Sequence, residues 1–541
     1  MAASPSCTLI PQYDCVASGV YGLSGCYILF ESILRDLTGA RELFANMPSY
    51  SAIAGASADS AGTRRRRRRS LKDLNFAGQA SWVSSVINLV NTIIGAGTLA
   101  MPLAMSHMGI ALGTVVIVWS GLTAAFGLYL QSQCARYLDR GSSSFFALSQ
   151  ITYPNAAVIF DAAIAIKCFG VGVSYLIIIG DLMPGVAMGI NENVANVEFL
   201  VDRHFWVTVF MLVVIPLSFL RRLDSLKYTS IIALVSIGYL VILVVYHFCK
   251  GDTMADRGEI LVFEWAGLVP TLRSFPVIVF AYTCHQNMFS ILNEIKDNSH
   301  TSTTSVIGAS IGSAASVYVL VAITGYLSFG SGVAGNIVGM YAPSLASTIA
   351  KAAIVILVMF SYPLQVHPCR ASVDAVLKWR PNSFKAASNS PDNSPSRSRL
   401  LSSSSPSRAA KKNDQIDELR FAVITTVVIV LSYIVAMSVS SLDKVLAYVG
   451  STGSTSISFI LPGLFYYKIS NPDSIHHQRL IKEDDELESD AEDTVAGVGL
   501  LKSNSWRKSV LRKLALALSI YGIFVMIVCL LINLIFSGGA H

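Results

Sequence analysis

The chain has few charged residues: they make up 14% of its 541 residues, whereas soluble domains carry about 25%. Hydrophobic residues make up 53%, and they are gathered in long runs rather than in short alternating segments. Long apolar runs are typical of helices that cross a membrane, whereas short alternating segments are typical of β-barrels. The composition therefore excludes a mostly soluble protein and predicts an all-α polytopic membrane protein.

Signatures of several other protein classes are also missing. The nine cysteines form neither a CxxC pair nor a metal-binding spacing, so we expect no metal and no cofactor. The sequence contains no N-x-Ser/Thr sequon, no P-loop and no kinase signature. No nucleophile is paired with a base at a recognisable spacing, so we do not expect an enzyme.

Eleven runs are long and apolar enough to cross a membrane. They lie near residues 83–105, 109–131, 157–180, 205–220, 228–248, 270–290, 304–328, 344–366, 418–440, 445–467 and 512–537. Lys and Arg are concentrated in the even-numbered gaps, which the positive-inside rule places in the cytosol together with the N-terminus. Six consecutive arginines, Arg64–Arg69, precede the first span, and we expect them to contact anionic lipid of the bilayer rather than nucleic acid.

This pattern divides the chain into five parts. We expect a disordered cytosolic segment over 1–80, helices 1–5 over 81–248, helices 6–10 over 249–467 with a disordered loop at 367–417, an acidic cytosolic loop over 468–511, and an eleventh helix with a short lumenal tail over 512–541. Residues 1–46 match no targeting signal, and a translation start at Met47 is one hypothesis. Ser-Pro pairs near residues 390–406 offer sites to regulatory kinases.

Two spans have polar residues where an anchor would be apolar. The first contains Asn91-Thr92 and then Gly95-Ala96-Gly97. One Gly-x-Gly is more often a packing feature than a functional one. The sixth span, however, has a polar centre over Tyr282–Asn287. Interruptions at matching positions of two five-helix halves are a sequence indicator of an inverted-repeat transporter.

Unwinding the first span at Ile94–Thr98 would free backbone N–H and C=O groups at a depth where each costs several kcal/mol unless it is paired. The freed N–H groups begin the second half-helix, whose dipole favours an anion such as a carboxylate. Glycine lets a ligand approach the backbone closely. The sequence thus predicts a ligand site at the break.

The motifs "NTIIGAGTLAMP", "KCFGVGVSYLIIIGD", "FAYTCHQNMFSILNEIKD" and "MFSYPLQVHPCR" together resemble the amino acid/auxin permease family. Within it the chain looks most like the fungal vacuolar amino acid transporters, which are related to the sodium-coupled neutral amino acid transporters. The resemblance implies a LeuT-like 5+5 inverted repeat with discontinuous helices 1 and 6, an extra helix 11, and a substrate site between helices 1, 3, 6 and 8. The matching positions are Asn91, Thr92, Gly95, Ala96, Gly97 and Thr98 in the first span and Tyr282, Thr283, Cys284 and His285 in the sixth.

Ionisable residues inside a membrane span are functional candidates. His285 is a candidate for proton coupling because the ordinary pKa of histidine, about 6.5, lies between those of an acidic lumen and a neutral cytosol. The alternative is a neutral histidine that holds the unwound turn together. Lys167, in the third span, is a second candidate, and a lysine satisfied by backbone carbonyls is its alternative. For Asp161, Asp181, Glu294 and Lys351, near span ends, we expect interfacial anchoring.

We therefore expect a secondary active transporter that carries amino acids across the vacuolar membrane, coupled to protons and running from lumen to cytosol. The amino acid, the proton and the vacuole come from the resemblance. A sodium-coupled symporter of the plasma membrane is one alternative. A non-transporting amino acid sensor whose cytosolic loops recruit partners is another.

Overall fold

The computed structural model describes residues 78–138, 140–220, 229–254, 257–378, 418–474, 477–478 and 498–536. The chain divides into two units, Met1–Lys72 and Asp73–His541, and every described residue belongs to the second. Several predictions concern segments outside the described residues. These are the N-terminal segment with Arg64–Arg69, the Ser/Pro-rich part of the loop 367–417, the acidic run Glu483–Asp493 and the tail Ser537–His541.

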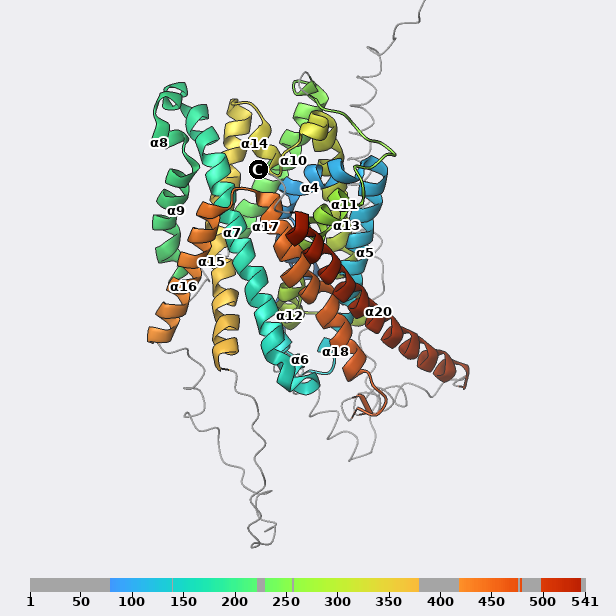
Figure 1. The fold of residues 1–541 in the computed structure, drawn as a ribbon. Helices are drawn as coiled ribbons and strands as arrows, with labels where there is room; N and C mark the ends of the chain where they lie inside the picture. Colours follow the sequence, from blue (N-terminus) through green and yellow to red (C-terminus); the bar gives the residue numbers. More distant parts are fainter. Residues whose placement is uncertain are drawn as a thin grey trace, which may run out of the picture. The chain divides into compact units, whose positions relative to one another are not determined.

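The described residues are helical and contain no strand, and Figure 1 shows most of the long helices packed side by side. The helices at the eleven predicted positions are, in order, α3 Trp82–Ile93 with α4 Ala96–Met108, α5 Ile110–Ala135, α7 Ala157–Ile190, α9 Arg203–Ser218, α10 Thr229–Lys250, α11 Leu268–Ala281 with α12 His285–Glu294, α13 His300–Phe329, α15 Leu345–Lys378, α16 Glu418–Ser438, α17 Leu442–Val449 leading to α18 Leu461–Ile469, and α20 Val498–Phe536. Short helices α6 Phe145–Thr152, α8 Glu198–Val201 and α14 Ile337–Met340 lie between them.

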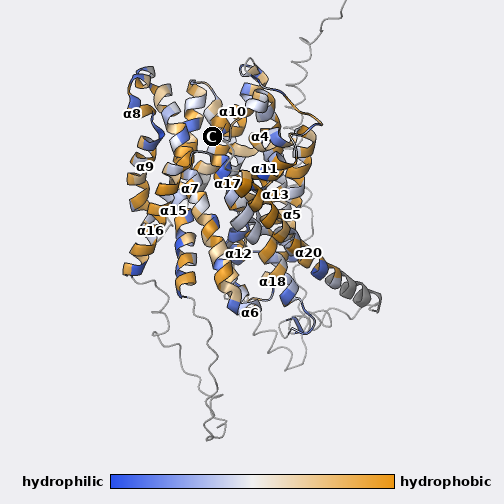
Figure 2. Ribbon diagram, viewed as in Figure 1, coloured by the Kyte–Doolittle hydropathy of each residue, from blue (hydrophilic) through white to orange (hydrophobic). Residues whose placement is uncertain are grey.

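In the described part of the chain, seven helices are long and apolar enough to cross a membrane, and the bent pair α3–α4 raises the number to as many as eight. Helix α9 is apolar but has 16 residues, and the sixth and tenth positions are split into shorter segments. Apolar residues cover much of the long helices, and hydrophilic residues are more frequent near their ends (Figure 2). The all-α polytopic class is confirmed, and the number of eleven spans stays a prediction.

Both predicted interruptions are present. Helices α3 and α4 meet at an angle of 56° across Ile94 and Gly95. Helices α11 and α12 are separated by Tyr282–Cys284. The prediction of unwinding as far as Thr98 was wrong, because Gly97 and Thr98 are already helical in α4. A short break leaves fewer backbone groups without helical partners, which is the cheaper arrangement inside a membrane.

Hydrogen bonds at both ends show that the two broken spans run in opposite directions. Before α3, Ala80 N–H donates to Glu294 C=O, and Lys296 N–H donates to Ala80 C=O, each at 2.9 Å. The start of the first span therefore adjoins the end of the sixth. At the other end Ile110 N–H donates to Leu261 C=O at 3.0 Å, so the end of the first span adjoins the segment that precedes the sixth. Opposite directions are what an inverted repeat requires.

The hydroxyl of Tyr318, in α13, joins the two breaks. It donates to the C=O of Ile93 at 2.6 Å and to the C=O of Ala281 at 2.9 Å, sharing its single proton between them. These carbonyls end α3 and α11, where the interruption removes the regular partner four residues ahead. Tyr318 is fully buried, so its hydroxyl replaces a bond that water cannot supply.

Two features of the C-terminal part differ from the expectation. Span ten is not a regular α-helix: Gly450–Ser454 and Ser456–Ile460 are π-helical. π-Helical turns are rare and occur frequently at functional sites. Helix α20 begins at Val498 rather than near residue 512, so the predicted loop 468–511 is shorter than expected.

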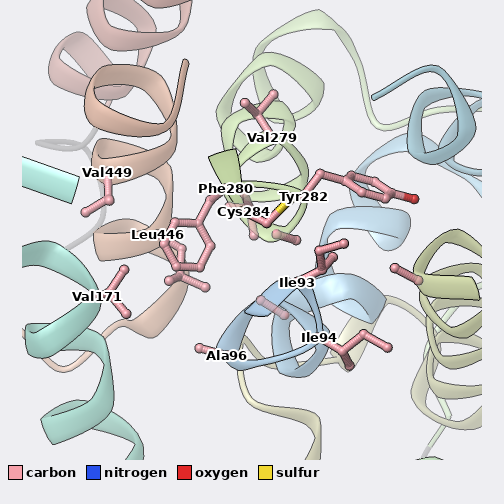
Figure 3. Packing of buried hydrophobic residues seen from close by; sticks show 14 of the residues in the cluster. Ile93, Ile94, Ala96, Val171, Val279, Phe280, Tyr282, Cys284, Leu446 and Val449 are labelled. Atoms are coloured by element: carbon pink, nitrogen blue, oxygen red, sulfur yellow. The ribbon is translucent and has the colours of Figure 1, made fainter. Parts of the chain in front are cut away.

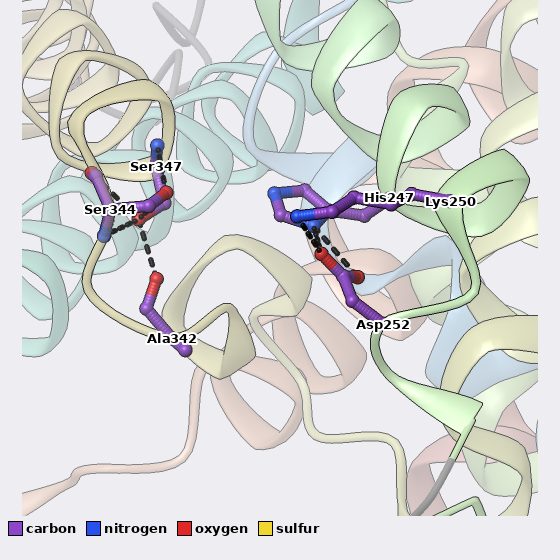
Figure 4. A network of polar contacts seen from close by, with 6 residues as sticks. All are labelled: His247, Lys250, Asp252, Ala342, Ser344 and Ser347. Atoms are coloured by element: carbon purple, nitrogen blue, oxygen red, sulfur yellow. Dashed lines mark hydrogen bonds and ion pairs between the residues drawn. The ribbon is translucent and has the colours of Figure 1, made fainter.

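Two groups of polar contacts lie close together, His247 with Asp252 at the end of α10 and Ser344 with Ser347 and Ala342 at the start of α15 (Figure 4). Asp252 accepts hydrogen bonds from His247 Nδ1 at 2.9 and 3.0 Å, and the His247 ring stacks on Tyr341 with centroids 4.5 Å apart. The Lys351 Nζ donates to the C=O of Tyr341 at 2.9 Å. Lys351 is buried, so the expectation that it anchors at an interface was wrong: a backbone carbonyl satisfies its ammonium group. The contacts hold α10 and α15 together at this end.

We predict that Tyr318→Phe destabilises the protein, because it leaves two buried carbonyls without a donor. The expected loss is about 2 kcal/mol, measured as a lower Tm of the purified protein in detergent. Tyr239→Phe is the matched control, since the Tyr239 hydroxyl donates at 3.1 Å to Ala346 C=O within the regular helix α15. An equal Tm loss for the two variants would contradict a special role for Tyr318.

Candidate functional site

The two glycines of the first break have different surroundings. A Cβ atom added to Gly95 would meet nothing within 4 Å. A Cβ atom added to Gly97 would lie 2.8 Å from Ala281 Cα, which is closer than such atoms approach. Gly97 is therefore required for the packing of α4 on α11. Gly95 leaves space at the break that a ligand can use.

A small apolar cavity lies beside Gly95. Its lining comes from the first span, α10 and α15 and consists of Gly95, Ala96, Leu99, Ile237, Leu240, Ile354, Leu357 and Val358. The cavity holds about 10 Å³, whereas one water needs roughly 10–15 Å³. This conformation is closed at Gly95, and a ligand of amino acid size requires α10 or α15 to move away from the break.

The second half-helices begin without side-chain caps. Neither Gly95, the N-cap of α4, nor Cys284, the N-cap of α12, provides a side-chain hydrogen bond. Elsewhere in the chain, Ser81, Ser144 and Ser299 cap the first turns of α3, α6 and α13. A buried helix N-terminus without a cap presents N–H groups and a partial positive charge. Both breaks are therefore suited to a negatively charged group.

The predicted residues of the sixth span lie together but face different neighbours. The Tyr282 ring packs against Gly121 of α5 and stands edge-on to Tyr318, with centroids 5.1 Å apart. In Figure 3, Phe280 points towards Leu446, whereas Tyr282 points to the opposite side. The Tyr282 ring therefore packs between α5 and α13.

Thr283 and Cys284 complete this break. The Thr283 hydroxyl donates to Val279 C=O at 2.8 Å and accepts from Ser458 Oγ at 3.2 Å. The Cys284 side chain is fully buried directly before α12. The hydroxyl contact connects the sixth span to the π-helical part of the tenth.

The polar residues ahead of Gly95 connect the two broken spans. Thr92 Oγ1 donates to Asn88 C=O and accepts from Asn287 Nδ2, both at 2.9 Å. The nearby Asn91 Oδ1 is buried and has no partner among the described residues. Ala96 and Thr98 are also buried in the first turns of α4. The structure therefore brings the predicted residues of both spans into one region.

His285 fastens α12 to α5. Its Nε2 donates to Ala124 C=O at 3.1 Å, and its own C=O accepts from Gln131 Nε2 at 2.8 Å. The other ring nitrogen, Nδ1, is buried without a partner among the described residues. A histidine held in this way has one nitrogen available for a proton.

Lys167 approaches the same region from α7. It is 4% exposed, and its backbone packs against Gly453, where a Cβ atom would lie 2.8 Å from Lys167 Cβ. Its Nζ has no hydrogen-bond or ion-pair partner in the described part of the chain, and its charge acts on both Cys284 and His285. A buried ammonium group beside an uncapped helix N-terminus needs an anion to offset its charge.

Sequence reasoning missed two parts of this region. Tyr318 lies in an otherwise ordinary apolar span and gives no local signal. The run "GSTGSTSIS", Gly450–Ser458, could have been recognised as a second polar interruption, because small and hydroxyl residues dominate the middle of a span. Ser451, Ser454, Thr455 and Ser458 are buried there. Among the described residues, no cluster of His, Cys, Asp and Glu could hold a metal ion.

Comparison with known proteins gives matches over most of the chain. The family model described as "Transmembrane amino acid transporter protein" matches residues 78–485. Vacuolar amino acid transporter 5 of Schizosaccharomyces pombe is 43% identical, over 84% of this chain and 95% of the relative. Vacuolar amino acid transporter 6 of Saccharomyces cerevisiae is 41% identical, over 72% of this chain and 90% of the relative. Sodium-coupled neutral amino acid transporter 7 of Danio rerio is 26% identical, over 72% and 78%.

Solved structures are less similar. MhsT in complex with L-phenylalanine aligns with a TM-score of 0.49 at 13% identity, over 84% of this chain and 99% of that one. Mhp1 in its inward-facing conformation aligns with a TM-score of 0.48 at 10% identity, over 72% and 77%.

The two glycines of the first break give a matched pair of variants. Gly97→Ala should lower the stability by about 1–3 kcal/mol, because the methyl group forces α4 away from Ala281. Gly95→Ala should leave Tm nearly unchanged and weaken amino acid binding about tenfold, because the methyl group occupies the free space at the break. Tm and equilibrium binding of a labelled amino acid measure the two effects. The interpretation would be contradicted if Gly95→Ala lowered the Tm while Gly97→Ala kept the wild-type Tm and only weakened amino acid binding.

Proposed function

Because the chain belongs to the transmembrane amino acid transporter protein family, we propose that it is a secondary active transporter of amino acids in the vacuolar membrane. Membership of the family makes it a transporter and not an enzyme. The vacuolar membrane is supported by the relatives at 40–43% identity, which are vacuolar amino acid transporters of two yeasts. The observation that carries the proposal is the pair of uncapped, buried half-helix N-termini at Gly95 and Cys284.

An amino acid zwitterion matches the charge pattern of these breaks. The N-termini of α4 and α12 offer partial positive charge to a carboxylate, and the Lys167 ammonium group adds a full charge beside α12. The carboxyl ends of α3 and α11 lie at the same breaks and offer partial negative charge to the amino group. In our proposal the substrate completes the polar contacts that the broken backbone lacks.

The apolar cavity beside Gly95 supplies the rest of the site. Its lining from α10 and α15 would contact the side chain of the substrate once the two helices move from the break. The network of His247, Asp252 and Tyr341 ties these helices together at one end. Opening at the other end, with this network intact, is one half of the alternating access that we propose.

We propose coupling to protons, and the electrostatic interaction between Lys167 and His285 supports it. A proton on His285 is repelled by the Lys167 ammonium group. A substrate carboxylate bound at the N-terminus of α12 offsets that charge, so substrate and proton favour one another's binding. We propose that the acidic lumen supplies the proton and that net movement runs from lumen to cytosol.

Sodium coupling is the competing hypothesis, since sodium-coupled relatives are 26% identical or less. A sodium site needs a cage of oxygen atoms, and the hydroxyls of Thr92 and Thr98 are the candidates in the first span. The Thr92 hydroxyl already takes part in two hydrogen bonds, to Asn88 and from Asn287. The Thr98 hydroxyl remains, but it is one of the several oxygen atoms that a sodium cage needs, so we favour the proton.

The proposed function predicts gradient-driven uptake by the purified protein in liposomes. With the common amino acids tested one by one, at least one should accumulate under an imposed proton gradient in sodium-free buffer, and an uncoupler should abolish the accumulation. Accumulation that requires sodium would replace protons as the coupling ion. No movement of any amino acid under either gradient would contradict transport and favour the sensor.

His285→Gln should separate transport from proton coupling. Glutamine retains an N–H donor for the Ala124 carbonyl but cannot titrate, so the variant should exchange labelled for unlabelled amino acid and fail to accumulate it under a proton gradient. Counterflow and gradient-driven uptake in the same liposomes measure the two activities. A variant that still accumulates substrate with the wild-type dependence on pH would exclude His285 as the coupling group.

A further inference from the structure

The loop between α10 and α11 carries large apolar side chains on the outside of the protein. Its residues 261–266 read "LVFEWA" and belong to no helix. Val262 and Trp265 are both 46% exposed, and Phe263 is 87% exposed, the highest value among the large apolar side chains that the structure describes. Apolar side chains that gather on a surface mark a place that a partner or a membrane covers. We call residues 261–266 the aromatic loop.

Hydrogen bonds fix the aromatic loop against the first turn of α5. The N–H groups of Ile110 and Ala111 donate to the C=O groups of Leu261 and Val262, at 3.0 and 2.9 Å. At the other end of the loop, Ala266 N–H donates to a carbonyl in the last turn of α4 at 3.3 Å. In Figure 1 the chain between α10 and α11 reaches the outer side of the helices next to α5. The loop is therefore held where the predicted second span enters the membrane.

The aromatic loop adjoins the lipid-facing side of α5. Val115, Trp119 and Leu122 are 64%, 52% and 61% exposed, and their spacing places them on one face of a helix that is apolar enough to cross a membrane. Ala111, which donates to the loop, lies one turn before Val115 on that face. The exposed side chains of the loop therefore lie at the end of a surface that lipid covers.

We propose that the aromatic loop inserts Phe263 and Trp265 into the interfacial region of the bilayer, in the leaflet where α5 begins. The indole ring of tryptophan is apolar apart from one N–H donor, and such rings occur at the level of the lipid headgroups. Glu264, which is exposed, lies between the two aromatic residues in the sequence and limits the depth of insertion, since a carboxylate is costly in hydrocarbon. On the predicted orientation, this leaflet faces away from the cytosol.

An anchored loop acts on both broken spans. It is bonded to the end of α4 and leads directly into α11, and these are the two half-helices on that side of the breaks. Insertion holds their outer ends at one depth in the leaflet while other parts of the site move. The loop thus supplies a fixed point for the opening of the cavity at Gly95. This role rests on the proposed function, whereas the insertion itself does not.

A second copy of the chain is the other candidate to cover the aromatic loop. Across a two-fold axis the loop would meet itself, and the exposed residues Glu259 and Glu264 would face their own copies. Like charges brought together at an interface oppose association. In the bilayer arrangement both carboxylates stay in water, so we assign the loop to the bilayer.

Quenching of tryptophan fluorescence by brominated lipids tests the insertion. The purified full-length protein is placed in bilayers whose lipids carry bromine either near the headgroup or near the end of the chain, and the emission of Trp265 is the difference between wild type and Trp265→Phe. Bromine near the headgroup should quench this emission about twofold more strongly, because an interfacial ring lies at the headgroup level. Trp119 gives the matched control: it lies about 14 Å beyond Ile110 along α5 at 1.5 Å per residue, so the difference between wild type and Trp119→Phe should show the opposite order.

Emission of Trp265 that aqueous iodide quenches and neither lipid quenches would overturn the proposal, as would the deep pattern expected for Trp119. Protection from iodide and from both lipids would also overturn it, and a dimeric mass in detergent would then assign the loop to a second copy. Should Trp265→Phe not fold, Phe263→Trp carries the test, and the emission that it adds should show the same preference for bromine near the headgroup. None of these readouts needs transport, so a failure of the proposed function leaves the test of insertion intact.

Discussion

The structure depends on how a broken helix satisfies its backbone inside a membrane. Each interruption leaves a carbonyl at the end of one half-helix and N–H groups at the start of the next. The Tyr318 hydroxyl donates to both carbonyls, Ile93 and Ala281, and so fixes the two breaks side by side. The N–H groups at Gly95 and Cys284 receive no such cap. The protein therefore provides a donor of its own for the last carbonyl of α3 and of α11, and leaves the N–H groups of α4 and α12 to a substrate.

Some residues around the breaks serve helix packing, and others are available for binding. Gly97 allows α4 to contact Ala281, and the Tyr282 ring fills the space over Gly121. Gly95 keeps a space open at the first break. Lys167 of α7 lies near Cys284 and His285 at the second break, and its ammonium group has no hydrogen-bond or ion-pair partner in the described part of the chain. With the cavity at Gly95 closed to about 10 Å³, the conformation is one in which the site is assembled but has no room for a substrate.

The sequence was informative where a residue type is improbable in its surroundings. Glycines and amides within apolar spans predicted both breaks, and Lys/Arg counts predicted the opposite directions that the Ala80 and Leu261 hydrogen bonds confirm. The length of the first break was overestimated, because glycine permits unwinding but hydrogen bonding limits it. Tyr318 could not be found, since its importance arises from partners far away in the sequence. The roles of Gly95 and Gly97 were equally invisible, because what surrounds a glycine is a tertiary property.

The central claim is that the broken spans hold the substrate through its carboxylate, and an experimental structure of the protein with a transported amino acid bound tests it most directly. The account predicts density for the amino acid beside Gly95, with its carboxylate within hydrogen-bonding distance of backbone N–H groups in the first turn of α4 or α12 and near Lys167 Nζ. Density for an amino acid that contacts neither half-helix N-terminus, in a protein that transports it, would contradict the account.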